Sequence, residues 1–313
     1  TGSGKSTTLY SMLNALNTTD RKLITLEDPI EYGLSGMSQI PIDTTHGQSF
    51  ADGLRSVLRL DPDVVMVGEI RDVDTARTAI QASITGHLVL SSFHANTTST
   101  AFSRMIDMIG VNPIFSSAIR LLIAQRLVRR LVDHTKEAYE PDEATRKYVQ
   151  RVLEKLPPDV EKPDLDNFKL WRPVPSEDAP FGYKGRVVIM EQLVVTDEIQ
   201  KFIRGDVQDV HPETIEETAR NEGMLTLEQV GVLAALRGGI KHVLIPTDNV
   251  KDLEEIPQNV KDGLEIHAVQ WIDEVFEHGL EYQPQPFAVD ALPENAISVQ
   301  PAPKKRRSTA PKH

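Results

Sequence analysis

The sequence contains no cysteine, and this absence excludes several kinds of site. A disulfide framework, a cysteine-ligated zinc ion and a thiol nucleophile all depend on that residue. Long apolar runs are missing as well: no stretch of about 20 apolar residues occurs, and a helix needs that length to cross a bilayer. The sequence therefore predicts a chain that does not span a membrane.

Positive charge is also scarce. There are 34 lysines and arginines against 46 aspartates and glutamates, which gives a net charge of -12 and a pI near 5.3. This balance argues against a general affinity for DNA phosphate or anionic lipid. A basic run at 304–307 lies in a proline-rich tail. We interpret it as a solvated tail, with contact to acidic lipid or nucleic acid as the alternative.

The chain begins with Thr1 rather than methionine, and it opens directly into a glycine-rich run. It shows none of the charged-then-apolar pattern of a signal peptide. Because a protein does not normally start inside such a loop, we interpret the sequence as a fragment whose upstream part is missing.

The length of 313 residues suggests about two domains of roughly 150 residues each. Hydrophobic residues make up 40% and charged residues 26%, an ordinary balance that rules out global disorder. In residues 1–132, short apolar runs alternate with longer segments of helical spacing, which predicts a mostly parallel sheet with helices on its faces. The expected strands are 22–26, 64–67 and 87–90, and the expected helices are 5–16, 50–60, 72–85, 97–108 and 113–124.

The chain changes character after residue 132. The expected elements there are a helix at 142–156, an irregular proline-rich connector at 157–180, a strand at 183–195, and helices at 197–204, 212–221 and 226–237. A shorter α/β pattern follows, with strands at 243–245 and 264–266 and a helix at 272–280. Residues from about 283 onward lack periodicity, and we predict that they are disordered.

Gly2-Ser3-Gly4-Lys5-Ser6 fits the end of a phosphate-binding loop, G-x-x-x-x-G-K-[ST]. Glycines let the backbone approach phosphate oxygens, Lys5 would place its charge on the β- and γ-phosphates, and the Ser6 hydroxyl would hold Mg²⁺. The helix that begins there adds its positive N-terminal end. The first glycine of the pattern would lie before Thr1. The alternative is a Gly/Ser turn that caps a helix.

Carboxylates follow two of the expected strands. Glu69 follows the apolar run 64–67, where ligands bind in open α/β sheets, and it would reach Mg²⁺ through water. Glu27, Asp28 and Glu31 cluster after the preceding strand, an arrangement that is costly unless a cation or a water-activating task compensates it. The alternatives are a solvated glutamate and an acidic turn.

Two histidines bracket the third expected strand. His87 and His94 are seven residues apart, an odd separation that places them on opposite faces of a regular strand. His94 lies at the strand end, where it could sense a γ-phosphate, whereas His87 belongs to the strand entrance. For each histidine the alternative is a hydrogen-bonded structural role.

Together, these segments closely resemble the ATPases of type II secretion and type IV pilus assembly, over residues 1 to about 238. The matching segments are 1–10, 24–32, 53–72, 85–96 and 124–131, and they include the family's Walker A loop, Asp box, atypical Walker B and His box. The resemblance implies an α/β fold with a RecA-like P-loop NTPase core and a small C-terminal helical part. It also implies a homo-hexamer on the cytoplasmic face of the inner membrane, with a membrane platform as partner and no specific nucleic acid.

The resemblance further implies ATP and Mg²⁺ as cofactors and a role for each matching residue. The nucleotide-binding residues would be Thr1, Gly2, Ser3, Gly4, Lys5, Ser6 and Thr7, with Ser6 and Glu69 holding Mg²⁺. Glu31 would be the base that activates water, supported by Glu27 and Asp28. His87 and His94 would belong to the His box, with His94 as the phosphate sensor.

The sequence departs from the family in two places. Many secretion members carry a four-cysteine zinc knuckle after the segment that matches 124–131, and residues 132–138 hold no cysteine, so we expect no zinc. The family's N-terminal domain, which supplies arginines to the nucleotide, is absent from the sequence.

A second resemblance covers roughly residues 233–280, which look like the end of the Lon protease domain. The serine segment of the Lon Ser-Lys dyad is absent, and Gly231 stands where the lysine would fall, so proteolysis lacks both groups. We interpret the chain as a joined sequence. The predicted domains are a core at 1–132, the C-terminal part of the motor at 133–238, a Lon-like segment at 239–282 and a tail at 283–313.

The leading hypothesis is a fragment of an ATP-hydrolysing motor for secretion or pilus assembly, in which water attacks in line and Mg²⁺ neutralises the phosphate charge. Two alternatives stay open. One is a catalytically incompetent truncated or fused product, and the other is a Lon-related protease fragment.

Overall fold

The structure is a computed structural model that describes residues 2–157, 160, 162–237, 242–246 and 265–269. The chain divides into two units, residues 1–240 and 241–313. The elements of the first unit are α1 (Lys5–Leu16), β1 (Leu23–Glu27), β2 (Ser38–Pro41), η1 (Thr44–His46), α2 (Phe50–Leu58), β3 (Val64–Ile70), α3 (Val73–Ile84), β4 (Leu88–Phe93), α4 (Thr98–Ile109), η2 (Pro113–Phe115), β5 (Leu121–Leu131), β6 (Glu137–Tyr139), α5 (Glu143–Glu154), β7 (Leu170–Arg172), β8 (Tyr183–Val194), α6 (Asp197–Arg204), α7 (Pro212–Asn221) and α8 (Leu227–Arg237).

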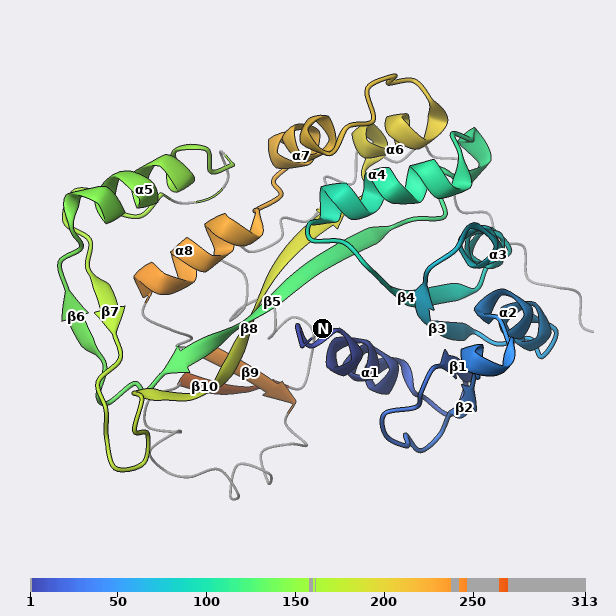
Figure 1. The fold of residues 1–313 in the computed structure, drawn as a ribbon, viewed down its shortest axis with the longest axis horizontal. Coiled ribbons are helices and arrows are strands. Elements are labelled where there is room, and N and C mark those ends of the chain that lie inside the picture. Colours follow the sequence, from blue (N-terminus) through green and yellow to red (C-terminus); the bar gives the residue numbers. More distant parts are fainter. Residues whose placement is uncertain (1, 158–159, 161, 238–241, 247–264, 270–313) are drawn as a thin grey trace, which may run out of the picture. The chain divides into compact units, whose positions relative to one another are not determined.

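The predicted parallel sheet is confirmed. Four parallel strands lie in the order β2-β1-β3-β4, with helices packed on both faces (Figure 1). All five residues of β1 are buried, as are the first four of β3. Strands covered on both faces read as continuous apolar runs rather than as alternating patterns, which is why these two runs were visible in the sequence.

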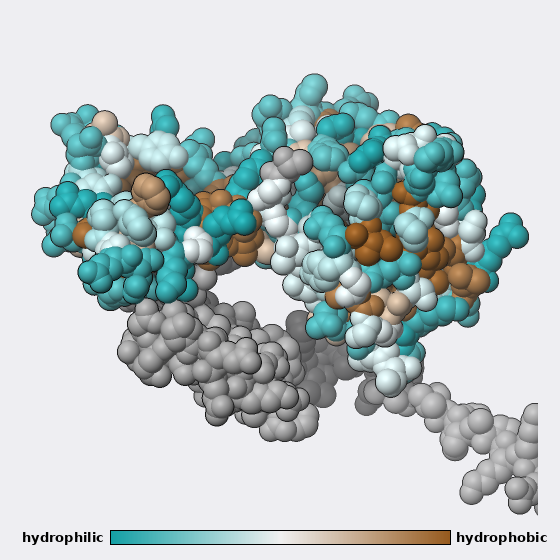
Figure 2. All heavy atoms as spheres, turned by 60° about the horizontal axis from the view of Figure 1, so that its bottom comes forward, coloured by the Kyte–Doolittle hydropathy of each residue, from teal (hydrophilic) through white to brown (hydrophobic). Residues whose placement is uncertain are grey.

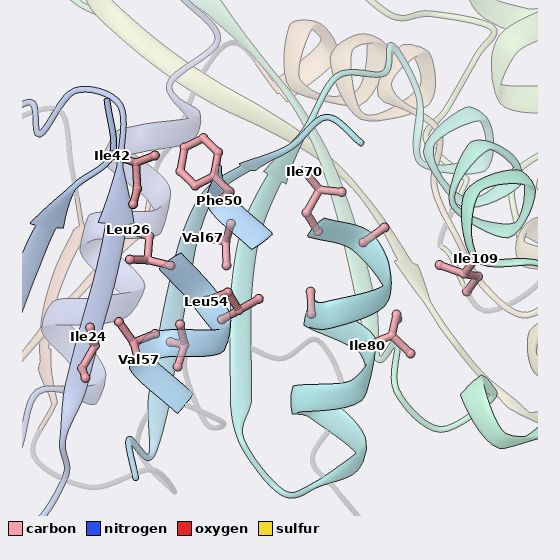
Figure 3. Close-up of a cluster of buried hydrophobic side chains, with 13 residues drawn as sticks. Ile24, Leu26, Ile42, Phe50, Leu54, Val57, Val67, Ile70, Ile80 and Ile109 are labelled. Atoms are coloured by element: carbon pink, nitrogen blue, oxygen red, sulfur yellow. The ribbon is translucent and has the colours of Figure 1, made fainter. Parts of the chain in front are cut away.

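Alternation along the strands divides the core between the two faces. Ile24 and Leu26 of β1, with Val65 and Val67 of β3, join a buried cluster with α2 and α3 (Figure 3). The alternate residues face the other side of the sheet and pack against Tyr10 and Leu13 of α1. These residues are Leu23, Val64 and Met66. The helix that carries the glycine-rich loop is thus anchored on one face of the sheet.

Several helices begin at polar caps that the sequence supplies. The side chains of Ser49, Asp72, Thr97 and Asp142 each accept a hydrogen bond from a backbone N–H three residues on, at the starts of α2, α3, α4 and α5. Such caps satisfy amide groups that have no partner inside the helix. They place the observed helix starts within one residue of the predicted ones.

The predicted helix at 113–124 is wrong. Pro113–Phe115 forms a single 3-10 turn, and the long strand β5 begins at Leu121. β5 pairs antiparallel with β8 along most of its length, from Leu121 opposite Val194 to Leu131 opposite Tyr183. Short apolar runs fit helix and strand alike, and the partner that decides between them lies more than 50 residues further along the chain.

The short strands β2, β6 and β7 were not predicted. β2 pairs with β1, and β6 pairs with β7. β7 lies within the segment 157–180, which we expected to be irregular. Strands of three or four residues carry little periodic signal.

The predicted helical end piece is confirmed as α6, α7 and α8. A second buried cluster joins Phe102 and Ile106 of α4 to Phe202 of α6 and Ile215 of α7. A third joins α5 to α8, with Leu153 fully buried.

A buried carboxylate, that of Glu191 on β8, ties two helix starts together. It is 2% exposed and accepts hydrogen bonds from the Thr98 amide at 2.7 Å, the Thr98 hydroxyl at 2.6 Å and the Leu227 amide at 3.1 Å. Thr98 begins α4 and Leu227 begins α8, so one anion meets the positive ends of both helices.

Replacing Glu191 with alanine is expected to destabilise the fold by about 2–3 kcal/mol, because two helix-start amides lose a charged acceptor. The measurement is urea-induced unfolding followed by circular dichroism. The matched control is Glu137→Ala, which removes an exposed pair with Arg172 that contributes at most about 1 kcal/mol. Equal losses in the two variants would contradict the bridging role.

A groove of about 450 Å³ is lined by residues of β4 and β5 and by residues of α1. β4 is an edge strand of the sheet, and Leu88 is exposed there. The side chains along the groove are mostly apolar, whereas the face of the molecule drawn in Figure 2 is mainly hydrophilic, with apolar side chains in separate patches. Among the described residues, no helix combines the length and the apolar character needed to cross a bilayer.

The second unit is described only at β9 (His242–Pro246) and β10 (Glu265–Val269), which pair in parallel. The predicted strands at 243–245 and 264–266 are confirmed for the residues that β9 and β10 contain. The predicted helix at 272–280 and the tail from 283 lie outside the described residues.

Candidate functional site

The glycine-rich loop has the backbone that a phosphate-binding loop needs. Gly2 and Gly4 have φ angles of 82° and 86°, in the left-handed region that glycine adopts without strain. Gly4 is the N-cap of α1, so the loop passes directly into the helix start at Lys5, as predicted. Thr1, also expected in this loop, lies outside the described residues.

Strand β5 holds the loop in place. The Gln125 side-chain amide donates to the Ser3 carbonyl at 2.8 Å and accepts from the Thr8 hydroxyl at 2.9 Å. A Cβ atom at Gly4 would lie 3.1 Å from Gln125 Nε2, a close approach that leaves little room for a side chain. Gln125 is 5% exposed, and sequence reasoning missed it as a site residue. The sequence signal that could have identified Gln125 was a single side-chain amide within the mostly apolar run 121–128.

Ser6 and Glu31 are brought together. The Ser6 hydroxyl donates to Glu31 Oε1 at 2.9 Å, which joins the first turn of α1 to the loop after β1. Asp28 has a different partner, because its carboxylate accepts from the Thr44 hydroxyl. Of the three clustered carboxylates, Glu31 is therefore the one that contacts the phosphate-binding loop.

Glu27 is not part of a solvent-facing cluster. Its side chain is 4% exposed and points toward α1, where it accepts a hydrogen bond from the Tyr10 hydroxyl. It also accepts from the Thr25 hydroxyl at 2.5 Å and from the Gln39 side-chain amide at 3.1 Å. Burial, followed by the hydrogen bond to Glu27, raises the pKa of Tyr10 to about 12. Three internal hydrogen-bond donors offset the cost of burying this carboxylate.

Glu69 and His94 meet at the carboxyl ends of β3 and β4. The Glu69 carboxylate contacts the Arg71 guanidinium, and its Oε2 atom lies 3.1 Å from His94 Nε2. The Arg104 guanidinium of α4 donates to the His94 carbonyl at 2.5 Å and covers the Phe93 ring at 5.4 Å from its centre. A side chain on the next helix therefore restrains the backbone of His94.

His87 lies at the other end of β4. Its Nδ1 atom is 3.1 Å from both the Thr85 hydroxyl and the Ala82 carbonyl, at the end of α3. The structure thus places His94 with Glu69 and keeps His87 apart from that pair.

The electrostatic environment of His94 disfavours its charged form. Partial desolvation, then the positive charges of Lys5 and Arg71, lower the pKa of His94 below the ordinary histidine value. Because the charge of Lys5 acts on His94, the loop lysine lies within electrostatic range of the His94–Glu69 pair. A neutral ring can donate from Nε2 to the Glu69 carboxylate.

His94 is expected to titrate below about 6.5, the ordinary value for histidine, and Lys5→Ala is expected to raise its pKa because a repelling charge is removed. The measurement is an NMR titration of the ring protons. Lys147→Ala, which removes an exposed lysine paired with Glu143, is the matched control and should leave the titration unchanged. An equal response to both substitutions would contradict this electrostatic influence of Lys5 on His94.

The chain is similar in sequence to proteins of secretion and pilus assembly systems. The family model described as "Type II/IV secretion system protein" matches residues 1–256. The chain is 42% identical over 253 residues to the type II secretion system protein E of Xanthomonas campestris, an alignment that covers 80% of this chain and 42% of the relative. It is 40% identical over 264 residues to the type IV pilus assembly ATPase PilB of Pseudomonas aeruginosa, covering 84% and 42%.

The fold has a solved counterpart in the ATPase DotB of Legionella pneumophila, with a TM-score of 0.51 and 24% identity. That likeness covers 77% of this chain and 55% of the DotB chain. The chain thus spans less than half the length of the two curated relatives and about half that of the solved one.

The family match continues to residue 256, past the predicted end of the motor region near 238. The resemblance of 233–280 to Lon stays a prediction, as do the four predicted domains. Because the family model matches residues 1–256 and two relatives are 40% identical or more, the chain belongs to the type II/IV secretion system protein family.

Proposed function

We propose that this chain carries the catalytic core of an ATP-hydrolysing motor that powers type II secretion or type IV pilus assembly. The observation that carries the proposal is the hydrogen bond between Ser6 and Glu31, which places a carboxylate beside the phosphate-binding loop. The names of two relatives, a secretion system protein E and a pilus assembly ATPase, support the choice of process.

The loop would bind the nucleotide phosphates. Its glycines allow backbone N–H groups to face the ligand, the N-terminus of α1 favours negative charge, and Lys5 adds a full positive charge. Gln125 would keep the loop in that shape through its bond to the Ser3 carbonyl. Gly2, Ser3, Gly4 and Thr7 complete the proposed nucleotide-binding residues in the described part of the chain.

The oxygen donors at the site fit Mg²⁺, which prefers hydroxyl, carboxylate and water ligands. Ser6 would hold the ion directly and Glu69 through water. When bound, the ion would neutralise charge on the phosphates.

Three side chains would act on water and phosphate. Glu31 would accept a proton from the attacking water, since a base must lie within hydrogen-bond reach of the proton that it removes. Glu69 would hold His94 through the contact at 3.1 Å, and His94 would respond to the γ-phosphate. Glu27 and Asp28 would support the loop that carries Glu31, through their bonds to Tyr10 and Thr44.

The proposed motor is a homo-hexamer at the cytoplasmic face of the inner membrane, working on a membrane platform. In such an assembly, part of each nucleotide site comes from another domain or subunit. The 313 residues alone would then bind nucleotide but turn ATP over poorly.

Two measurements test the function. Binding of a fluorescent ADP analogue to the 313-residue chain should be saturable, Mg²⁺-dependent and displaced by ATP, and the full-length protein should release phosphate from ATP. Absence of both would favour a catalytically incompetent product, and cleavage of an unfolded protein substrate would favour the protease alternative.

A further inference from the structure

Tyr10 lies one helical turn beyond Ser6 on α1. Residues four apart lie on the same face of a helix, so this position faces the loop that carries Glu31. The ring is 3% exposed, between the helix and the sheet. Its hydroxyl donates to Glu27 and accepts from the Glu31 backbone amide at 3.3 Å.

The hydroxyl has a defined orientation. Glu27 is an acceptor, so the Tyr10 proton points toward it and an oxygen lone pair is left for the Glu31 amide. A pKa of about 12 keeps the phenol protonated at every pH at which the protein would work. Because Glu27 holds the phenol proton, the Tyr10 hydroxyl oxygen stays oriented to accept the hydrogen bond from the Glu31 backbone amide.

The residues after Glu31 are held by the same network. Gln39, which donates to Glu27, also donates to the Tyr32 carbonyl at 3.2 Å and accepts from the Leu34 amide at 2.6 Å. The Tyr32 ring meets the Tyr10 ring edge to face, with 4.5 Å between centres. The backbone from residue 31 to residue 34 is therefore anchored to α1 and to the buried Glu27.

We propose that Tyr10 is a positioning residue that sets the Glu31 carboxylate beside Ser6, and that buried Glu27 serves as the anchor for Tyr10. This inference rests on the proposed function, in which Glu31 activates water. The helix that supplies Ser6 thereby also sets the position of the base, one turn later. Glu27 acts through Tyr10 and Gln39 and does not face the nucleotide.

The test is Tyr10→Phe, which keeps the ring and removes the hydroxyl. In the full-length protein, kcat for ATP hydrolysis should fall by at least about tenfold, because small displacements of a catalytic group cost that much or more. The Kd for a fluorescent ADP analogue should change less than twofold. The matched control is Tyr148→Phe, which likewise removes a hydroxyl that donates to a carboxylate, that of Glu228 at 2.8 Å, but away from the loop, so both values should stay unchanged.

A second readout does not depend on turnover. Hydrogen exchange of the Glu31 amide, measured by NMR in the 313-residue chain, should become at least about fivefold faster in Tyr10→Phe, because exchange reports local opening. The amides of β1 serve as the reference and should be unaffected. If the wild type does not hydrolyse ATP, the proposed function fails, while faster exchange still upholds the anchoring of Glu31 and unchanged exchange overturns it.

An unchanged kcat in Tyr10→Phe, in a protein that hydrolyses ATP, would overturn the proposal whatever the exchange shows. Loss of kcat without faster exchange at Glu31 would also overturn it. If Tyr10→Phe does not fold, because Glu27 keeps an underpaired buried charge, the double variant Tyr10→Phe with Glu27→Gln replaces it, with Glu27→Gln as its control.

Discussion

Replacing Lys5 with alanine is expected to abolish ATP hydrolysis in the full-length protein and to weaken nucleotide binding. The phosphates lose their main cation, and a charge-assisted contact is stronger than a neutral one. Lys5 stands at the first position of α1, after a glycine in the left-handed region, so an alanine should preserve the local backbone. Steady-state phosphate release measures the effect.

Lys147→Ala is the matched control for this prediction. Lys147 lies on α5 and pairs with Glu143, and both side chains are more than 70% exposed. Its removal should leave turnover unchanged, since exposed pairs contribute little. Hydrolysis by Lys5→Ala at the rate of this control would show that the nucleotide does not bind at the loop.

Glu31→Gln and Glu69→Gln are each expected to retain nucleotide binding and to lose turnover by about 100-fold or more, the usual scale of acid–base catalysis. The amide of Glu31→Gln can still accept from the Ser6 hydroxyl but cannot take a proton from water. In Glu69→Gln, the contacts with Arg71 and His94 lose their charge. Fluorescence titration and phosphate release separate binding from turnover.

The control for these variants is Glu143→Gln, the same chemical change at an exposed helix position. It should leave both binding and turnover unchanged. Normal hydrolysis by Glu31→Gln would remove that residue from the mechanism, and it would also remove the reason for Tyr10 to position it.

The sequence was most informative where buried strands end at polar residues. β1 and β3 are covered on both faces, so their apolar runs stand out from their surroundings. The glycine-rich loop is equally visible, because its chemistry requires glycines and a lysine at set positions. The pairs Ser6–Glu31 and Glu69–His94 join residues that the sequence had already singled out.

What the sequence did not reveal depends on partners far away along the chain. β5 is a strand because β8 pairs with it, and Gln125 of this strand contacts the glycine-rich loop through the Ser3 carbonyl. Glu27 faces α1 because residues 23, 25 and 27 of β1 alternate onto that face, and it is buried because both faces of β1 are covered. A strict period-2 reading of β1 could have separated Glu27 from Glu31.

The carboxylate of Glu191 has a mechanical consequence. This carboxylate accepts hydrogen bonds from the starts of α4 and α8. Helix α4 is also bonded to the segment that holds His94, because its Arg104 donates to the His94 carbonyl. If α4 shifts alone, a buried anion loses donors, at a cost of about 1–3 kcal/mol. A joint displacement of α4 and α8 would keep these hydrogen bonds and would therefore cost less free energy. Any displacement of α4 would therefore be expected to carry α8 with it, because the starts of both helices are bonded to one buried charge.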